Sequence, residues 1–320
     1  MPLPQAVLQA AESEALAQEL NPILVVAGPT ASGKTDLALA LAARLGGEVV
    51  SADMGQLYRG LDAGTAKPRG VRRGGVTLAD GIPYHLLDEL DIPEPSDAGG
   101  YARKAAPVLD DILRRGRRAI VAGGTGLYLR ALLEGLDPLP QRDLALRARL
   151  EKRSREELHA ELVRRDPESA RRIPPGNRQR VVRALEVCEL AGRPFSELCR
   201  RGSRPPRYER VLTLGIERTP EELSRRIRER AEAMFPAMLE EAARLVPSRF
   251  SGAEPGFRCL GYPEALACLR GELSAQQGLE GMIRSTLAYA KRQRTWFRHQ
   301  AQVRWLDPAV DPARLAAELA

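Results

Sequence analysis

Residues 28–35 read Gly28-Pro29-Thr30-Ala31-Ser32-Gly33-Lys34-Thr35 and fit the phosphate-loop pattern G-x-x-x-x-G-K-[ST]. The apolar run before them, 23–27, predicts a buried strand, and residues 36–45 after them predict a helix. A glycine-rich turn between a strand and a helix directs backbone N–H groups and the positive end of the helix dipole at a bound phosphate. Lys34 can neutralise the terminal phosphate oxygens, and Thr35 can ligate Mg²⁺. The order of strand, motif and helix therefore predicts a binding site for a diphosphate or triphosphate.

The second acid of a conventional nucleotide site is missing from its usual place. Enzymes that use ATP or GTP carry an acidic Mg²⁺ partner at the end of a second hydrophobic strand. The candidate strand, 118–122, is followed by Gly-Gly-Thr-Gly at 123–126 and by no carboxylate. Another predicted strand, 48–53, ends in Asp53. We expect Asp53 at the carboxyl edge of the sheet beside the phosphate loop, where open α/β sheets bind their ligands.

Composition sets the class of protein. The chain has 320 residues with 43% hydrophobic content, enough for one large core or two modest ones. Residues 1–20 lack the basic-then-apolar order of a signal peptide, and no apolar run approaches the ~20 residues that span a bilayer. No zinc site is expected, because there is no C-x-x-C pair and the histidines are scattered: Cys188, Cys199, Cys259, Cys268, His85, His159 and His299. We expect a cytoplasmic protein with reduced thiols and no membrane partner.

The net charge of +7 is unevenly distributed. Residues 171–210 contain four glutamates against eleven arginines: Arg171, Arg172, Arg178, Arg180, Arg183, Arg193, Arg200, Arg201, Arg204, Arg207 and Arg210. Arginine suits bidentate contacts to phosphate, so this patch favours a nucleic acid backbone as partner. A solvated face in an arginine-rich protein remains the alternative explanation.

Strand and helix patterns alternate on both sides of a helical segment. A helix at 101–115, the strand at 118–122 and a helix at 127–133 indicate an α/β fold with a doubly wound parallel sheet flanked by helices, as in P-loop NTPases. The Gly/Arg-rich residues 69–75 are predicted to be a mobile loop.

From residue 138 onward the patterns become helical, at 144–155, 156–165 and 179–190, until a strand returns at 211–216. We therefore predict a catalytic core at 20–137 and 205–307, an all-helical insertion at 138–204, and terminal extensions at 1–19 and 308–320. Long helices at 221–245 and 283–298 complete the predicted core, and the first places Arg226 and Arg230 on one face.

Several linked motifs resemble those of one family, the bacterial tRNA dimethylallyltransferases (isopentenyl-tRNA transferases). The resemblance covers roughly residues 22–307 and rests on GPTASGKT at 28–35, the Asp53 loop, GTAKP at 64–68, HLLD at 85–88, GGTGLYLRALLEGL at 123–136, QRVVRALEV at 179–187, RCLGYPE at 258–264 and AKRQRTWFR at 290–298. Each motif after the phosphate loop is weak alone, whereas the set in this order and spacing is specific.

The resemblance implies transfer of a dimethylallyl group from dimethylallyl diphosphate to N6 of the adenosine 3′ of the anticodon, position 37 of tRNA. An exocyclic adenine amine is a poor nucleophile because its lone pair is delocalised, so a carboxylate that takes the N6 proton would help, and Asp53 is the candidate. Lys34, the loop amides and Mg²⁺ near Thr35 would stabilise the departing diphosphate. Thr125 joins Asp53 and Lys34 as an expected catalytic residue, and Arg226 and Arg230 are expected diphosphate ligands.

The resemblance also implies an interface with the tRNA anticodon stem-loop, whose adenosine must leave its stack to react. The expected tRNA-facing residues are Asp53, Met54, Gly55, Gln56, Thr125, Arg147, Gln179, Arg180, Arg258, Cys259, Leu260, Gly261, Tyr262 and Pro263. Met54 stands where the family commonly has serine, which puts one hydroxyl contact to the substrate in doubt. The zinc-finger extension of eukaryotic relatives is missing, and we expect a monomer.

Two other functions fit part of the sequence. A phosphate-loop kinase of a small metabolite would explain residues 23–53 but not the arginine-rich insertion or the aromatic and basic helix at 289–298. A nucleotide-dependent RNA-binding switch would use the loop and the basic patch but leaves Asp53 without a role.

Overall fold

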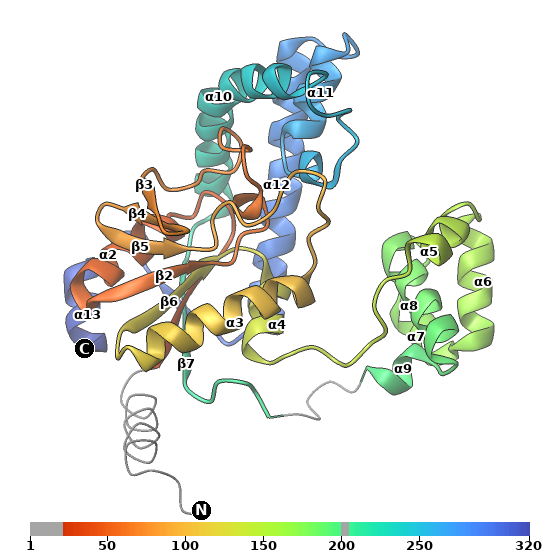
Figure 1. Ribbon diagram of the computed structural model, residues 1–320, viewed down its shortest axis with the longest axis horizontal. Coiled ribbons are helices and arrows are strands. Elements are labelled where there is room, and N and C mark those ends of the chain that lie inside the picture. Colours follow the sequence, from red (N-terminus) through yellow and green to blue (C-terminus); the bar gives the residue numbers. More distant parts are fainter. Residues whose placement is uncertain (1–21, 200–204) are drawn as a thin grey trace, which may run out of the picture. The chain divides into compact units, whose positions relative to one another are not determined.

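The structure, a computed structural model, describes residues 22–199 and 205–320 (Figure 1). Within them the chain forms two compact units, one made of the residues up to Leu133 and from Tyr208 to Ala320, the other of Glu134–Arg207. The predicted extension 1–19 and the patch residues Arg200, Arg201 and Arg204 lie outside the described residues.

The first unit is built on an eight-stranded sheet of order β3-β4-β5-β2-β6-β1-β7-β8. Its strands are β1 (Ile23–Ala27), β2 (Gly47–Ser51), β3 (Val71–Arg73), β4 (Val76–Ala79), β5 (Ile82–His85), β6 (Arg118–Gly123), β7 (Val211–Ile216) and β8 (Arg304–Leu306). From β5 to β8 all neighbours pair in parallel, as predicted. The sheet as a whole is mixed, because β3, β4 and β5 pair antiparallel.

The prediction of a mobile loop at 69–75 is wrong, since β3 and its turn occupy this segment. Arg73 pairs with Val76, so Gly74 and Gly75 form a two-residue turn, and both have positive φ, 55° and 85°. Two positive φ values in succession are what a tight hairpin turn requires, and glycine adopts them without strain. The Gly-Gly pair therefore marks a hairpin.

Helices cover both faces of the sheet. They are α2 (Lys34–Leu45), α3 (Ala98–Arg114), α4 (Gly126–Leu133), α10 (Pro220–Leu245), α11 (Tyr262–Leu269), α12 (Ala275–Gln300) and α13 (Pro312–Leu319), with short 3₁₀ turns at Gly55–Leu57 and Pro255–Arg258. Alternate strand residues point to opposite faces. Val25 and Val121 pack with α3, α4 and the C-terminal helices α10–α12, whereas Leu24 and Ile120 pack with α2 and α13.

The C-terminal residues return to the first helix of the unit. Residues 308–320, predicted as an extension, contain α13, whose Leu315 and Ala316 are buried in the cluster of α2 (Figure 1). The Arg118 guanidinium of β6 donates a hydrogen bond to the Leu319 carbonyl.

The second unit, green in Figure 1, consists of α5 (Leu144–Glu151), α6 (Arg155–Arg165), α7 (Pro167–Arg172), α8 (Arg178–Ala191) and α9 (Phe195–Leu198). Side-chain N-caps start the first four helices, at Asp143, Ser154, Asp166 and Asn177. Its apolar core includes Leu150, Leu158, Leu162 and Val182. Of its elements, α7 and α9 are not predicted from the sequence, since each is shorter than two turns and shows no helical period.

None of the helices in the described ranges is long and apolar enough to cross a membrane.

Candidate active site

Three neighbouring strands place three loops at one edge of the sheet. The phosphate loop follows β1, Asp53 follows β2, and Thr125 follows β6, which lies between the other two. Because these strands are parallel, their carboxyl ends meet where open α/β sheets bind ligands.

The phosphate loop leaves the start of α2 without a side-chain cap. Gly28, Ala31 and Gly33 have positive φ values of 148°, 63° and 99°. Gly33 precedes the helix, and no side chain caps the N–H groups of the first turn. The Ser32 hydroxyl is buried and has no hydrogen-bond partner within the described chain. Free amides at a helix N-terminus beside an unpaired buried hydroxyl form a site suited to an anion.

Side chains from distant helices hold the backbone of this loop. Arg226 Nε donates to the Ala31 carbonyl at 2.7 Å, and Arg218 Nε donates to the Ser32 carbonyl at 2.9 Å. The Thr30 N–H group of the same loop donates to Gln293 Oε1 at 2.9 Å. The loop conformation is therefore fixed by α10, by the segment that leads into it and by α12.

Two cations at the site are partly or fully desolvated and have no acid in ion-pair contact among the described residues. Lys34 is 9% exposed, and its Nζ donates to the Pro29 carbonyl at 3.4 Å. Arg230 Nε lies 3.2 Å from Met234 Sδ. Neither forms an ion pair with any carboxylate in residues 22–199 and 205–320. Burial, with the neighbouring Arg230, lowers the pKa of Lys34 although Asp53 opposes the shift, and burial likewise lowers the pKa of Arg230. A bound anion would relieve both penalties.

Asp53 and Thr125 are joined through the backbone of the two strand ends. Thr125 N–H donates to the Ala52 carbonyl, and Thr125 Oγ1 accepts from Met54 N–H, each at 3.3 Å. Asp53 Oδ1 accepts from Gly55 N–H at 3.0 Å. Burial, and then the charge of Asp53, raises the pKa of Tyr289 of α12 to about 12. The Asp53 carboxylate is thus held at a fixed position beside Lys34.

Gln293 connects the phosphate loop to the Thr125 loop. While its Oε1 accepts from Thr30, its Nε2 donates to the Gly124 carbonyl at 2.8 Å, and the side chain is buried. A Cβ at Gly124 would lie 2.2 Å from Gln293 Nε2, so glycine permits this approach. Sequence reasoning did not single out Gln293, although it lies in the AKRQRTWFR motif.

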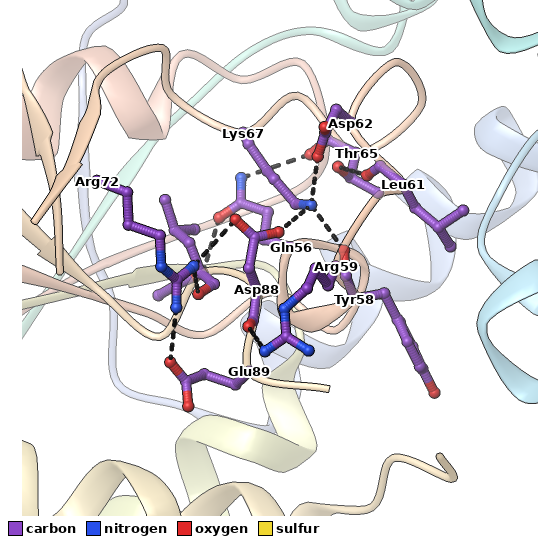
Figure 2. A network of polar contacts seen from close by, with 12 residues as sticks. Gln56, Tyr58, Arg59, Leu61, Asp62, Thr65, Lys67, Arg72, Asp88 and Glu89 are labelled. Carbon is purple, nitrogen blue, oxygen red and sulfur yellow. Dashed lines mark hydrogen bonds and ion pairs between the residues drawn. The ribbon is translucent and has the colours of Figure 1, made fainter. Parts of the chain in front are cut away.

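The segment after Asp53 is fixed by a buried lysine that has acid partners (Figure 2). Lys67 Nζ donates to the Tyr58 carbonyl and to the Asp62 and Asp88 carboxylates, each at 2.6 Å. Gln56 is buried in the same network, where it accepts from Ser51 Oγ at 2.7 Å and donates to the Ala66 carbonyl at 3.1 Å. The contacts of Lys67 satisfy its charge, unlike that of Lys34.

A small cavity of about 40 Å³ lies beside the phosphate loop. Apolar side chains line much of it, with Thr30, Arg230 and Thr286 as polar members, and the rest are Ala31, Gly64, Ile227, Ala231, Met234, Leu260 and Met282. A lining of this kind suits a small molecule with a charged head and a short apolar tail.

Known proteins resemble the chain over nearly its whole length. The family model described as IPP transferase matches residues 56–300, and that of Isopentenyl transferase matches 21–73. A protein named tRNA dimethylallyltransferase from Anaeromyxobacter sp. (strain Fw109-5) is 46% identical over 93% of this chain and 98% of its own length. One of the same name from Elusimicrobium minutum is 41% identical with the same coverage. The chain belongs to the tRNA dimethylallyltransferase family.

Solved structures of the family share the fold. The tRNA isopentenylpyrophosphate transferase from Bacillus halodurans is 33% identical, with a TM-score of 0.65 over 93% of this chain and 94% of that one. A eukaryotic dimethylallyltransferase, solved acting on tRNA, is 25% identical with a TM-score of 0.74 over 90% of this chain and 74% of that one. The family resemblance stated from the sequence motifs is therefore confirmed.

The residues predicted to face tRNA differ in their exposure to solvent. In the 258–263 segment Arg258 and Pro263 are exposed, Leu260 lines the cavity, and Cys259, Gly261 and Tyr262 are buried. The Tyr262 hydroxyl donates to Glu241 Oε1 at 2.5 Å and accepts from Gly64 N–H at 3.2 Å.

The other three assigned residues lie in the helical unit. Gln179 and Arg180 are exposed at the start of α8. Arg147 is half-buried and pairs with Glu151 at 3.2 Å and with the buried Glu186 at 3.6 Å. Its tRNA contact stays a prediction, like those of Gln179 and Arg180.

Oxygen donors for a metal ion lie beside the phosphate loop. Among the described residues no three His, Cys, Asp or Glu side chains come together as a metal-binding group. The Thr35 hydroxyl follows Lys34 at the start of α2, and Asp53 is the nearby carboxylate. Mg²⁺ takes hard oxygen ligands, commonly one or two from the protein with the rest from phosphate and water, so these residues fit it.

Proposed function

We propose that this chain transfers the dimethylallyl group of dimethylallyl diphosphate to N6 of adenosine 37, next to the anticodon of tRNA. The observation that carries the proposal is a pair of cations, the buried Lys34 and the half-buried Arg230, which form no ion pair and lie beside Asp53 in a chain of this family. The cations supply an anion site, and the carboxylate supplies a base.

The donor end binds and releases the diphosphate. The amides at the start of α2, Lys34 and Arg230 bind its oxygens, and Arg226 adds charge while it holds the Ala31 carbonyl. Negative charge grows on the diphosphate as the allylic C–O bond breaks, and preorganised donors stabilise that charge without reorganising. Mg²⁺ held by Thr35 would neutralise further charge on the leaving group.

The acceptor end removes the proton of N6. Asp53 takes this proton as the new C–N bond forms. Loss of the proton raises the electron density on N6, which offsets the delocalisation of its lone pair into the ring. Thr125 positions the carboxylate, since it accepts from Met54 N–H and donates to the Ala52 carbonyl on either side of Asp53. The adenosine reaches this point after it leaves the stack of the anticodon loop.

The architecture assigned to this function is a P-loop NTPase-like core with an inserted helical tRNA-binding domain at 138–204. Exposed cations such as Arg180 and Arg258 would contact the phosphates of the anticodon stem-loop. We propose that the protein acts as a monomer in the cytoplasm.

The test is incubation with Mg²⁺, dimethylallyl diphosphate and unmodified tRNA, followed by mass analysis of the nucleosides. We expect the mass of one dimethylallyl group on adenosine, and a roughly 10²- to 10⁴-fold slower transfer by Asp53→Asn with nearly unchanged tRNA affinity. Consumption of ATP in a parallel reaction without prenyl transfer would instead indicate a kinase. Full transfer by Asp53→Asn would exclude the general-base role of this residue.

A further inference from the structure

Thr286 has a buried hydroxyl that no described residue satisfies. The side chain lies on α12 and is 9% exposed, and its Oγ1 has no hydrogen-bond partner. An unsatisfied buried hydroxyl is costly, and native structures leave few of them without a reason. On the preceding residue, by contrast, Ser285 Oγ donates to the Met282 carbonyl at 3.1 Å.

Thr286 belongs to the lining of the cavity beside the phosphate loop. Thr286 lines this cavity together with Arg230 of α10 and Thr30 of the loop. Met282, one turn before Thr286 on the same face of α12, is an apolar part of the lining, as is Met234, one turn after Arg230 on α10. Polar and apolar groups therefore alternate along both helices at this point.

The mixed polar and apolar lining suits the part of a prenyl diphosphate where the diphosphate joins its short hydrocarbon chain. Arg230 is half-buried and forms no ion pair with a described residue, although the charge of Asp53 acts on it, so an anionic oxygen in contact with its guanidinium would be stabilising. A volume of about 40 Å³ holds roughly three or four groups the size of water, so the apolar lining suits a short tail rather than a long one. A hydroxyl next to Arg230 would complete the set of donors to that oxygen.

We propose that Thr286 is a donor-binding residue whose hydroxyl donates a hydrogen bond to a diphosphate oxygen of the prenyl donor, beside Arg230. The inference rests on the proposed function for the identity of the donor, and it adds a contact from α12 to those of the phosphate loop and α10. No bond to Thr286 forms or breaks in the reaction, because the residue holds the leaving group.

The decisive variant is Thr286→Val, which replaces the hydroxyl by a methyl group of similar size. A hydrogen bond to a charged group is worth roughly 10- to 100-fold in affinity, so KM for dimethylallyl diphosphate should rise by that factor while KM for tRNA changes little. Thr286→Ser should recover most of the loss, because it restores the hydroxyl. Ser285→Ala, a hydroxyl loss on the same helix outside the cavity lining, is the matched control and should behave as the unsubstituted protein.

Inorganic pyrophosphate with Mg²⁺ separates the head of the donor from its tail. If Thr286 contacts the diphosphate, Thr286→Val should weaken pyrophosphate binding, measured by calorimetry, by a factor similar to the rise in KM. Unchanged pyrophosphate affinity in a folded Thr286→Val protein, or a loss of affinity that Thr286→Ser does not recover, would overturn the proposal. If the unsubstituted protein transfers no prenyl group, the proposed function fails, whereas the ratio of pyrophosphate affinities still tests the contact.

Discussion

The candidate site of the first unit and the surface of the helical unit use positive charge in opposite ways. At the sheet edge of the first unit, Lys34 is buried and Arg230 is half-buried, and neither has an acid in ion-pair contact. In the helical unit the surface arginines are mostly neutralised by glutamates, as in Arg149 with Glu189 and Arg172 with Glu168. The others that pair with glutamates there are Arg147, Arg153, Arg164, Arg165, Arg183 and Arg193. Burial without an ion pair therefore distinguishes the cations of the candidate site, whereas the number of arginines does not.

The largest effect on activity is expected when Lys34 is substituted. Lys34→Met should lower kcat/KM for dimethylallyl diphosphate by roughly 10²- to 10³-fold, because a preorganised charge at the leaving group is lost. Its melting temperature should not fall, since the substitution removes an uncompensated buried charge.

Lys67→Met is the matched control for this prediction. Lys67 is also a buried lysine, but its ion pairs with Asp62 and Asp88 would be lost, so this variant should melt at a lower temperature. Equal destabilisation of both variants by thermal unfolding would contradict the distinction between partnered and unpartnered lysines.

Glu48 of β2 is a buried charge that, unlike Lys34, has ion-pair partners, so it tests the effect of removing a partnered charge. Its carboxylate is bound by Arg115, with one contact at 2.8 Å, and by His85 Nε2 at 2.7 Å. The Arg115 hydrogen bonds, and then that of His85, hold its pKa below the usual 4.5 although burial opposes them. The folded pKa is depressed, so the carboxylate stabilises the fold above about pH 4.5 and loses this contribution as the pH falls through the folded pKa.

Glu48→Gln should therefore cost about 1–3 kcal/mol at pH 7, and the difference from the unsubstituted protein should shrink as the pH falls below about 4.5. Denaturant unfolding at several pH values measures this difference, and prenyl transfer at pH 7 should persist. A constant difference down to pH 3 would contradict the role assigned to the carboxylate.

The smallest effects are expected in the helical unit. Among its described residues, the arginines without an ion pair are Arg142, Arg155, Arg171, Arg178 and Arg180. Arg180→Ala should weaken tRNA binding by about 2- to 5-fold and reduce the salt slope by about 1, as for one lost phosphate contact. Arg172→Ala removes the same charge from an arginine already paired with Glu168, so it should change less; affinities at several salt concentrations compare the two.

The parts of the site that follow strands could be predicted from the sequence. The phosphate loop, Asp53 and Thr125 each come directly after a hydrophobic strand, so the parallel sheet itself places them at one edge. The function also followed, because the order of eight motifs identified the family.

The contributions of α12 could not be predicted in the same way. Gln293 lies 263 residues from Thr30 and 169 from Gly124, and the cavity of Thr286 includes residues as distant in sequence as Thr30. A helical period does not say which face turns to the site. Ion pairs between distant residues could not be predicted either, since Arg149 and Glu189 are 40 residues apart in the sequence and meet only in the folded chain. Counting charges in one segment therefore does not show which arginines are paired: within 171–210, Arg172, Arg183 and Arg193 form ion pairs with glutamates.

The carboxamide of Gln293, which is bound to Thr30 on one side and to Gly124 on the other, has a consequence for protein engineering. Residues that share a hydrogen-bonded partner do not contribute independent free energies. Substitutions in the phosphate loop and substitutions in the Thr125 loop will therefore not combine additively in their effects on activity. A library that varies the two loops together will find combinations that two separate libraries miss.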